Sequence, residues 1–398
     1  MPHRVIVVGA GLVGSHLARL LAAERDLTVT VADVNQTALD AVASPQIRTL
    51  CANLLTPDQT ARFDDFDLVV GAVPGALGLR LLEVAINAGK RVVDISFSPE
   101  DPFTLRQLAV ECGVPIIVDC GLAPGLSNLA AGRTASKLAK TERIEILVGG
   151  LPVVRRYPFN YQAVFAPSDV IEEYVRPARF VENSRMVVRE ALSDIELHEF
   201  AGIGTLESFN TDGLRTLIHT LDAPEMKEKT LRFPGHAALM HQFRTAGFFS
   251  GEAVTVKTAD GGTAKVRPVD LTEALFRRSW ARPAHEEEFS VLRVDVDGTT
   301  NDGRRVRHRY ELLDRTTDGV SSMARTTATP AAIVAAGMLR GELTWPAPGV
   351  WPPELLADND TTWTTIQDRL AAHGIRLTFN ETALPPAPHA PGMHHPAR

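Results

Sequence analysis

The strongest constraint on the fold is a glycine-rich turn near the N-terminus. A short apolar, β-branched run at residues 4–8 leads directly into Gly-Ala-Gly-Leu-Val-Gly at residues 9–14, and helix-like apolar periodicity follows to about residue 24. In a strand–turn–helix unit, Gly9 permits the tight turn, Gly11 lets the backbone approach a bound pyrophosphate, and Gly14 lets helix and strand pack closely. The segment therefore predicts a dinucleotide-binding Rossmann unit. The alternative is a glycine turn of an α/β fold that binds nothing.

An acidic residue lies where such a unit needs one. Asp33 ends the next predicted strand, at residues 28–32, and its carboxylate is placed to accept hydrogen bonds from an adenosine ribose diol. Its charge would repel a 2′-phosphate, and Val34, Asn35 and Gln36 offer no cation to receive one. NAD is therefore favoured over NADP.

Strand and helix signals continue to alternate over the first third of the chain. Predicted strands at residues 67–72, 91–95 and 115–118 alternate with predicted helices at 78–88 and 102–112, which indicates a parallel sheet with right-handed connections. Ligands of such sheets bind at the carboxyl ends of the strands. The cofactor-binding candidates are Gly9, Gly11, Leu12, Val13, Gly14, Asp33, Asn53, Ala72, Val73, Pro74 and Gly121. For Pro74 a plain loop-forming role is equally compatible with the sequence.

The pattern changes beyond about residue 140. Strand signals that are more typical of an antiparallel sheet lie at residues 144–149, 181–188, 229–233, 253–257, 288–297 and 306–314, with turn signals at 260–262 and 297–298. We expect an α/β chain: a Rossmann domain (residues 1–128), a second α+β domain for substrate and dimerisation (129–320), a segment containing a helix at 329–339 that returns to the Rossmann domain (321–383), and a disordered Pro/His/Ala-rich tail (384–398).

Composition narrows the classes of partner. The net charge of -7 and the lack of a basic stripe argue against nucleic acid, and no apolar run is long enough to cross a membrane. The three cysteines have no CxxC spacing, and the start of the chain resembles no signal peptide, so we expect a cytoplasmic protein without a metal site. His394 and His395 in the tail are a weak alternative for metal. A homodimer or higher homo-oligomer is expected.

Five segments of the middle and later chain resemble the saccharopine dehydrogenase-like family, and within it most closely the lysine 6-dehydrogenases. They are residues 118–128 (VDCGLAPGLSN), 149–152 (GGLP), 206–213 (LESFNTDG), 229–236 (KTLRFPGH) and 322–327 (SMARTT). The resemblance runs from about residue 4 to about 345 and implies a Rossmann domain joined to an α+β domain, with an amino-acid amine as substrate. Saccharopine reductases tend to have an acidic residue before Pro124-Gly125. This chain has Ala123 there, as the lysine 6-dehydrogenases do, which favours a smaller diamino acid.

Oxidation of an amine by hydride transfer requires a group that binds the ammonium and accepts its proton. Asp94 and Asp119 lie at the ends of strands that should face the nicotinamide, so they are the catalytic candidates, although each is also placed to cap a following loop or helix. Cys120 has no adjacent base and is not expected to act as a nucleophile.

A substrate carboxylate calls for arginine. Arg215, Arg232 and Arg325 lie in or beside the family-like segments, and His236 and Tyr161 are further substrate-binding candidates. Each of these five has an ordinary structural alternative: a surface or paired arginine, a structural histidine, a core aromatic.

The predicted function is the NAD-dependent oxidative deamination of a free amino acid, specifically L-lysine at its ε-amine, which gives an aldehyde that cyclises to an imine. One alternative is a saccharopine-type imine reductase that joins an amino acid to a carbonyl compound, which would need additional cations. An alternative of another class is a non-catalytic NAD-sensing module.

Overall fold

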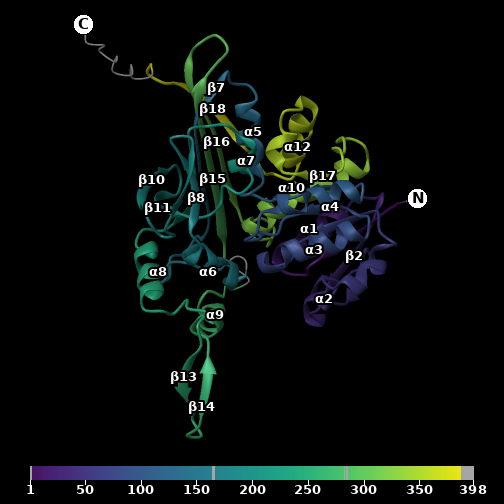
Figure 1. Ribbon diagram of the computed structural model, residues 1–398, viewed down its shortest axis with the longest axis vertical. Coiled ribbons are helices and arrows are strands. Elements are labelled where there is room, and N and C mark those ends of the chain that lie inside the picture. The colour runs from purple at the N-terminus through teal and green to yellow at the C-terminus, as the bar shows by residue number, and fades with distance from the viewer. Residues whose placement is uncertain (1, 164–165, 282, 284–285, 387–398) are drawn as a thin grey trace, which may run out of the picture.

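Seven parallel strands, six from the N-terminal part of the chain and β17 from its C-terminal part, form one sheet, which confirms the predicted α/β class (Figure 1). The computed structural model describes residues 2–163, 166–281, 283 and 286–386. In spatial order the strands are β17 (Gly349–Trp351), β6 (Pro115–Ile117), β5 (Arg91–Asp94), β4 (Leu68–Gly71), β1 (His3–Val8), β2 (Leu27–Asp33) and β3 (Ile47–Cys51). The helical connections of this sheet are α1 (Leu12–Ala22), α2 (Gln36–Val42), η1 (Pro57–Phe63), α3 (Gly75–Asn87), η2 (Pro102–Leu105) and α4 (Arg106–Glu111).

The central strands of this sheet are almost wholly apolar because helices cover both faces. The side chains of Val5 and Val7 pack in one core cluster and those of Ile6 and Val8 in another. A strand that is buried on both sides carries a continuous apolar run, and this explains why its pattern was readable in the sequence.

A second sheet of nine strands is mixed and lies beside the first (Figure 1). Its main path is β10 (Glu196–Phe200), β11 (Gly204–Asn210), β12 (Glu225–Arg232), β7 (Lys140–Pro152), β15 (Glu288–Thr299), β16 (Arg305–Arg315) and β18 (Thr378–Ala383), while β8 (Ala178–Glu182) and β9 (Arg185–Arg189) attach to β12. All of its pairings are antiparallel except that of β12 with β7. The helices of this half are α5 (Leu126–Ala135), α6 (Pro167–Val175), α7 (Leu217–Thr220), α8 (His236–Thr245) and α9 (Pro268–Ser279).

Three local expectations for this half are wrong. The predicted strand at 181–188 is the hairpin β8–β9, because Asn183 and Ser184 adopt positive φ and turn the chain. The expected turn at 297–298 lies inside β15, where the register shifts at a bulge, and the chain turns instead at residues 300–303. The strand predicted at 253–257 is β13 (Val254–Lys257), which pairs with β14 (Thr263–Val266) in a projecting hairpin outside the second sheet (Figure 1).

The C-terminal segment contributes to both sheets. Helix α10 (Ser322–Leu339) is longer than the predicted 329–339 and packs against α1, and β17 joins the parallel sheet beside β6. Helices α11 (Pro353–Leu356) and α12 (Asp360–Ala372) follow. Strand β18 instead pairs with β16, so residues 378–383 belong to the second sheet and not, as expected, to a segment packed on the Rossmann domain. Residues 387–398 of the predicted disordered tail, with His394 and His395, lie outside the described residues.

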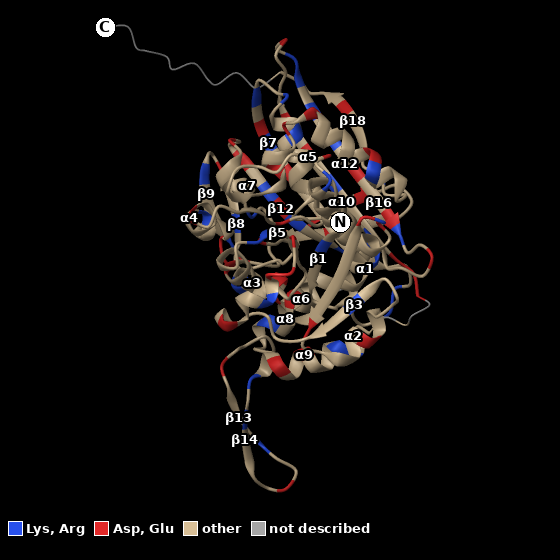
Figure 2. Ribbon diagram, turned by 90° about the vertical axis from the view of Figure 1, so that its right-hand side faces the viewer, with Lys and Arg blue, Asp and Glu red and all other residues tan. Residues whose placement is uncertain are grey.

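One apolar core joins the two sheets. Side chains of α1, α5, α10 and the inner face of the second sheet belong to a single cluster that includes Leu17, Leu129, Ile146, Leu292 and Ala335. Acidic and basic residues are interspersed over the strands of the second sheet, where pairs such as Arg307–Asp297 form across neighbouring strands (Figure 2). None of the described helices is both long and apolar enough to cross a membrane.

Candidate functional site

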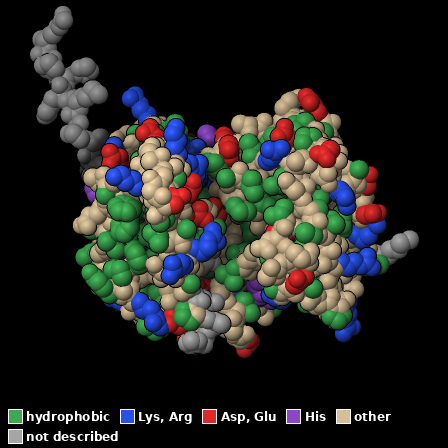
Figure 3. Space-filling view, turned by 90° about the horizontal axis from the view of Figure 1, so that it is seen from below, with side chains coloured by type: hydrophobic (Ala, Val, Ile, Leu, Met, Phe, Trp, Pro, Cys, Tyr) green, Lys and Arg blue, Asp and Glu red, His purple; other side chains and the backbone are tan. Residues whose placement is uncertain are grey.

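A cavity of about 640 Å³ lies between the parallel sheet and the second sheet. Seen from below, the molecule is hollowed between its two halves (Figure 3). The carboxyl ends of β1, β2, β4 and β5 lie on one side of the cavity, and α6, β12 and the loop after β11 lie on the other. This is the switch-point crevice in which open parallel sheets bind ligands.

The glycine turn at the cavity edge has the geometry that was inferred for it. Gly9 has a φ of 114°, and a Cβ there would lie 2.2 Å from the Ala72 carbonyl oxygen. A Cβ at Gly14 would lie 2.2 Å from the Gly9 oxygen, whereas a Cβ at Gly11 would meet no protein atom within 4 Å. Close packing against the backbone thus allows only glycine at positions 9 and 14. Gly11 keeps open space on the side from which a ligand approaches.

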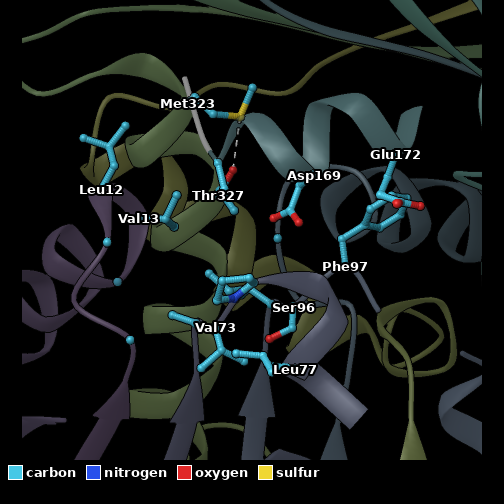
Figure 4. A pocket seen from close by; sticks show the side chains of 18 of the residues that line it. Leu12, Val13, Val73, Leu77, Ser96, Phe97, Asp169, Glu172, Met323 and Thr327 are labelled. Carbon is cyan, nitrogen blue, oxygen red and sulfur yellow. Dashed lines mark hydrogen bonds between the residues drawn. The ribbon is translucent and has the colours of Figure 1, made fainter. Parts of the chain in front are cut away.

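All of the cofactor-binding candidates line this one cavity. They are Gly9, Gly11, Leu12, Val13, Gly14, Asp33, Asn53, Ala72, Val73, Pro74 and Gly121. Asp33 accepts hydrogen bonds from the Ala10 N–H (2.7 Å) and the Asn35 N–H (2.8 Å), so its carboxylate ties the glycine turn to the end of β2. Figure 4 shows Leu12 and Val13 facing Val73 and Leu77 across this part of the cavity. An open glycine backbone, an acid at the end of β2 and an apolar slot together fit a dinucleotide.

The two predicted catalytic aspartates lie behind the cavity wall and not on it. Asp94 accepts hydrogen bonds from the Ser96 N–H (3.0 Å) and Oγ (2.9 Å), and burial raises its pKa to about 8. Asp119 forms a buried ion pair with Arg215. Burial also raises the pKa of the Cys120 thiol to about 12, which leaves it protonated. In this arrangement both aspartates support loops, the alternative that the sequence left open.

Arg215 likewise connects parts of the protein instead of lining the cavity. Its Nη2 lies 3.0 Å from Asp119 Oδ1, and its Nη1 donates to the carbonyl oxygen of Ser98. Because Arg215 belongs to the second half of the chain and its partners follow β5 and β6, the pair joins the two domains. A fully paired, buried guanidinium is not available to a substrate carboxylate.

Of the other predicted substrate residues, Arg232 lines the cavity. It pairs with Glu173 (2.6 Å) and its guanidinium lies 4.5 Å above the Tyr161 ring, so Tyr161 supports Arg232 from behind. His236 is buried between the Tyr174 hydroxyl and the Phe159 carbonyl oxygen. Burial lowers the pKa of His236 to about 3, so the ring is neutral and structural.

Arg325 points away from the cavity and is not among the residues that line it. Met323 and Thr327, four residues apart on α10, line the cavity on one face of the helix (Figure 4). Arg325 lies on the opposite face, where it contacts Asp314 at 3.3 Å and donates to the carbonyl oxygen of His373.

Several cavity residues were missed by the sequence reading. Helix α6 was not predicted at all: its apolar residues Val170, Ile171 and Tyr174 pack inward, while its polar face lines the cavity. Strand β12 was predicted only over residues 229–233, so Glu228 fell outside the predicted strand. The missed lining residues are Asp169, Glu172, Glu173, Arg176, Thr211, Asp212, Gly213, Glu228 and Thr230. The amphipathic pattern of residues 167–176 was the signal that would have found the helix.

Arg176 has hydrogen-bonding capacity to spare. It contacts Glu172 at 3.5 Å and lies 5.0 Å from the centre of the Phe97 ring. Within the described part of the chain, its buried Nε and Nη1 have no hydrogen-bond partner. Buried guanidinium donors without partners are costly, so they indicate a place where an anionic group binds.

Two carboxylates on the substrate side of the cavity have no cationic partner among the described residues. Glu173 and Asp212 pair with Arg232 and Arg179, but Glu228 and Asp169 form no ion pair there. Burial raises the pKa of Glu228 to about 8 and that of Asp169 to about 6. Buried carboxylates that lack a cation attract one, and a protonated amine is a cation of suitable size.

The fold and cavity define a dinucleotide-binding α/β protein with a mixed-sheet domain beside the crevice. The family model of the saccharopine dehydrogenase C-terminal domain matches residues 121–375, and that of the saccharopine dehydrogenase NADP binding domain matches residues 5–117. The chain belongs to the saccharopine dehydrogenase family, which confirms the resemblance seen in the sequence, and its N-terminal part is an NAD(P)-binding domain.

Relatives and solved structures agree with this assignment. The chain is 22% identical over 319 residues to saccharopine dehydrogenase (NADP(+), L-glutamate-forming) of Saccharomyces cerevisiae, covering 76% of this chain and 69% of that protein. It is 23% identical over 268 residues to the mitochondrial alpha-aminoadipic semialdehyde synthase of Mus musculus, covering 63% of this chain but only 29% of that longer protein.

Two solved structures share the fold. Saccharopine dehydrogenase (L-Glu forming) of S. cerevisiae has a TM-score of 0.76 at 19% identity, covering 96% of this chain and 100% of that one. Homospermidine synthase of Legionella pneumophila, solved in complex with NAD, has a TM-score of 0.65 at 11% identity, covering 99% and 95%.

Gly11→Ala tests the cofactor assignment. The new Cβ meets no protein atom, so the thermal stability of the ligand-free protein should stay close to wild type. The affinity for NADH, measured by fluorescence titration, should fall at least tenfold, or about 1.4 kcal/mol, because the methyl group occupies space needed by the pyrophosphate. Gly14→Ala is the contrasting control and should lower the melting temperature through its clash with Gly9. Unchanged NADH affinity in Gly11→Ala would contradict the assignment.

Arg215→Met tests the connection between the domains. The substitution leaves Asp119 buried and unpaired, so urea denaturation should show a loss of about 3–5 kcal/mol. The double variant Asp119→Leu/Arg215→Met removes both charges and should recover much of that loss. If the single variant is as stable as wild type, the pair does not hold the domains together.

Proposed function

We propose that this chain is a nicotinamide-dinucleotide-dependent dehydrogenase that oxidises a carbon–nitrogen bond of a free diamino acid, with L-lysine at its ε-amine as the first substrate to test. The observation that carries this proposal is the charge pattern of the cavity. Glu228 and Asp169 are carboxylates without cationic partners, and Arg176 is a cation with unused donors. These groups, one weakly paired arginine and two carboxylates without a cation, are complementary to one α-carboxylate and two amines.

The residues that would hold the dinucleotide support a preference for NAD. The glycine turn would receive the pyrophosphate, and Asp33 the adenosine ribose. Val34 and Asn35 line the same end of the cavity, and neither offers a positive charge to a 2′-phosphate. When bound, the nicotinamide ring would supply the acceptor for the hydride.

The second half of the chain would position the amine. Phe97, Met323 and Thr327 line the cavity (Figure 4), and they would exclude water from the place where the reacting carbon would lie. Arg176 would hold the α-carboxylate, and the cation-free carboxylates would hold the amines.

A second candidate is a saccharopine-type reaction, in which an amino acid and a carbonyl compound are joined or separated at a secondary amine. The names of the relatives favour it, as does the presence of a second arginine, Arg232, in the cavity wall. Saccharopine carries three carboxylates, however, and the acid-rich wall would repel the additional negative charge. A non-catalytic NAD sensor differs from both, because it would bind NAD without turnover.

The substrate screen that tests this proposal follows NADH absorbance. Purified protein receives NAD or NADP with L-lysine, ornithine, saccharopine, spermidine or putrescine, and a parallel set receives NADH with an aldehyde and an amino acid. We expect NADH to appear with L-lysine. Turnover of saccharopine alone would replace this proposal with the saccharopine-type reaction, and binding of NAD without any turnover would support the sensor.

Asp33→Asn tests the cofactor preference. The substitution keeps the shape of the side chain and an oxygen for the Ala10 N–H, but it removes the charge that opposes a 2′-phosphate. The ratio of kcat/KM for NAD to that for NADP should fall about tenfold, equivalent to about 1.4 kcal/mol. Because the ratio is measured on one variant, a general loss of activity cancels. An unchanged ratio would show that Asp33 does not discriminate.

A further inference from the structure

We propose that Glu228 is the catalytic carboxylate of this site: it binds the reacting ammonium and accepts its proton. The inference rests on the amine oxidation proposed above, and it replaces Asp94 and Asp119 as candidates for this role.

The position of Glu228 follows from the alternation of β12. Met226, Glu228, Thr230 and Arg232 point to the inner face of the second sheet, where Met226 belongs to the apolar core and the next three line the cavity. In parallel register, Glu228 lies opposite Ile146 and Thr230 opposite Val148 of β7. Glu228 therefore stands where the inner face changes from apolar core to cavity wall.

The carboxylate is held by neutral donors only. Its side chain is buried, the residue being 4% exposed, and Thr211 Oγ1 donates a hydrogen bond of 2.7 Å to Glu228 Oε2. Thr211 is itself within 3.0 Å of the Thr230 hydroxyl. Across the described ranges, no lysine, arginine or histidine pairs with Glu228. The residue is fixed in place, and no cation of the described residues balances its charge when the carboxyl group is ionised.

The neighbouring loop is shaped around this carboxyl group. A Cβ at Gly213 would lie 2.2 Å from the carboxyl carbon of Glu228, so any side chain at this position would displace the acid. Gly213 also lines the cavity, and its backbone N–H is a further donor to the carboxyl group. Because Gly213 has no side chain, the carboxyl group of Glu228 can reach the cavity on that side of the loop.

The other acids of the cavity are less suited to this role. Glu173 and Asp212 are bound to arginines, and Glu172 is about half exposed beside Arg176. Asp169 accepts a hydrogen bond from the Gly75 N–H at the start of α3, so it is engaged with the Rossmann domain. We therefore assign Asp169 to the second amine, and Glu228 to the reacting one.

The reaction balances with one carboxylate and one oxidised nicotinamide dinucleotide. The ammonium R–CH2–NH3⁺ transfers a proton to Glu228, and the nitrogen lone pair then forms the C=N bond as hydride leaves the carbon with its two electrons for the oxidised nicotinamide. The products are R–CH=NH2⁺, protonated Glu228 and the reduced dinucleotide. Water then adds to the iminium carbon, and the nitrogen leaves as an ammonium ion, which gives the aldehyde.

The ionisation of Glu228 is matched to this task. Burial raises the pKa of Glu228 from 4.5 to about 8. This brings it closer to the pKa of the amine whose proton it accepts, which favours proton transfer. Since the free site is protonated below pH 8, kcat/KM for amine oxidation should rise with pH through this value. A carboxyl whose pKa is raised on folding also stabilises the protein most below pH 4.5, and this contribution is lost as the pH rises towards 8.

Glu228→Gln is the decisive variant. It should lower kcat by about 10²–10⁴-fold and abolish the rise of kcat/KM near pH 8, while NADH affinity stays within about twofold of wild type. Without any substrate, the variant should also gain thermal stability relative to wild type above pH 8 but not below pH 4.5. Glu225→Gln, at the start of the same strand and outside the cavity, is the matched control and should keep the wild-type pH profile.

Thr211→Val provides a second test that does not depend on removing the carboxyl group. It deletes the hydroxyl that lowers the pKa of Glu228, so the rise of kcat/KM should move to higher pH, with activity recovered there. If wild type oxidises an amine and Glu228→Gln retains both its rate and its pH profile, the role of Glu228 is overturned and the proposed function stands. If wild type oxidises none of the amines offered, the proposed function fails and the role of Glu228 with it.

Discussion

The buried ion pair between Asp119 and Arg215 determines how the two halves of this protein meet. Asp119 follows β6 of the parallel sheet, and Arg215 lies in the loop between β11 and α7 of the second half. Both residues adopt positive φ, which few non-glycine residues do, and this points the two side chains at each other. Because the loop that carries Arg215 also carries Thr211 and Gly213, the ion pair brings the substrate side of the cavity against the dinucleotide side.

The inner face of the second sheet serves two purposes along its length. At one end, Ile144, Ile146 and Met226 pack in the core that both halves share; at the other, Glu228, Thr230 and Arg232 form the cavity wall. The apolar end of this face therefore stabilises the fold, and its polar end carries the side chains that line the cavity. Thr211 donates to Glu228, and Arg232 pairs with Glu173, which offsets part of the cost of burying these polar groups.

The Rossmann half and its cofactor turn could be predicted in detail, since the signals there are local. The turn from Gly9 to Gly14 and the acid at Asp33 depend on spacing along the chain, and all the predicted cofactor residues line one cavity. The substrate side could not be predicted in this way. Asp94 and Asp119 lie at or just beyond the ends of the expected strands, but whether a side chain faces a cavity or a neighbouring loop depends on its partners. Asp94 is held by the nearby Ser96, and Asp119 by Arg215 of the other domain.

By itself, the sequence determined the fold class, the family and the dinucleotide-binding turn, because each of them depends on particular residue types at short, fixed spacings. The tertiary structure decided which polar residues meet at the cavity. The polar residues of β12 face a cavity only because the Rossmann half lies against them, and the apolar residues of α6 are buried only because the core of the second half receives them. The physical reason is that burial, and with it the raised pKa of Glu228, comes from residues far away along the chain, and only folding brings them together.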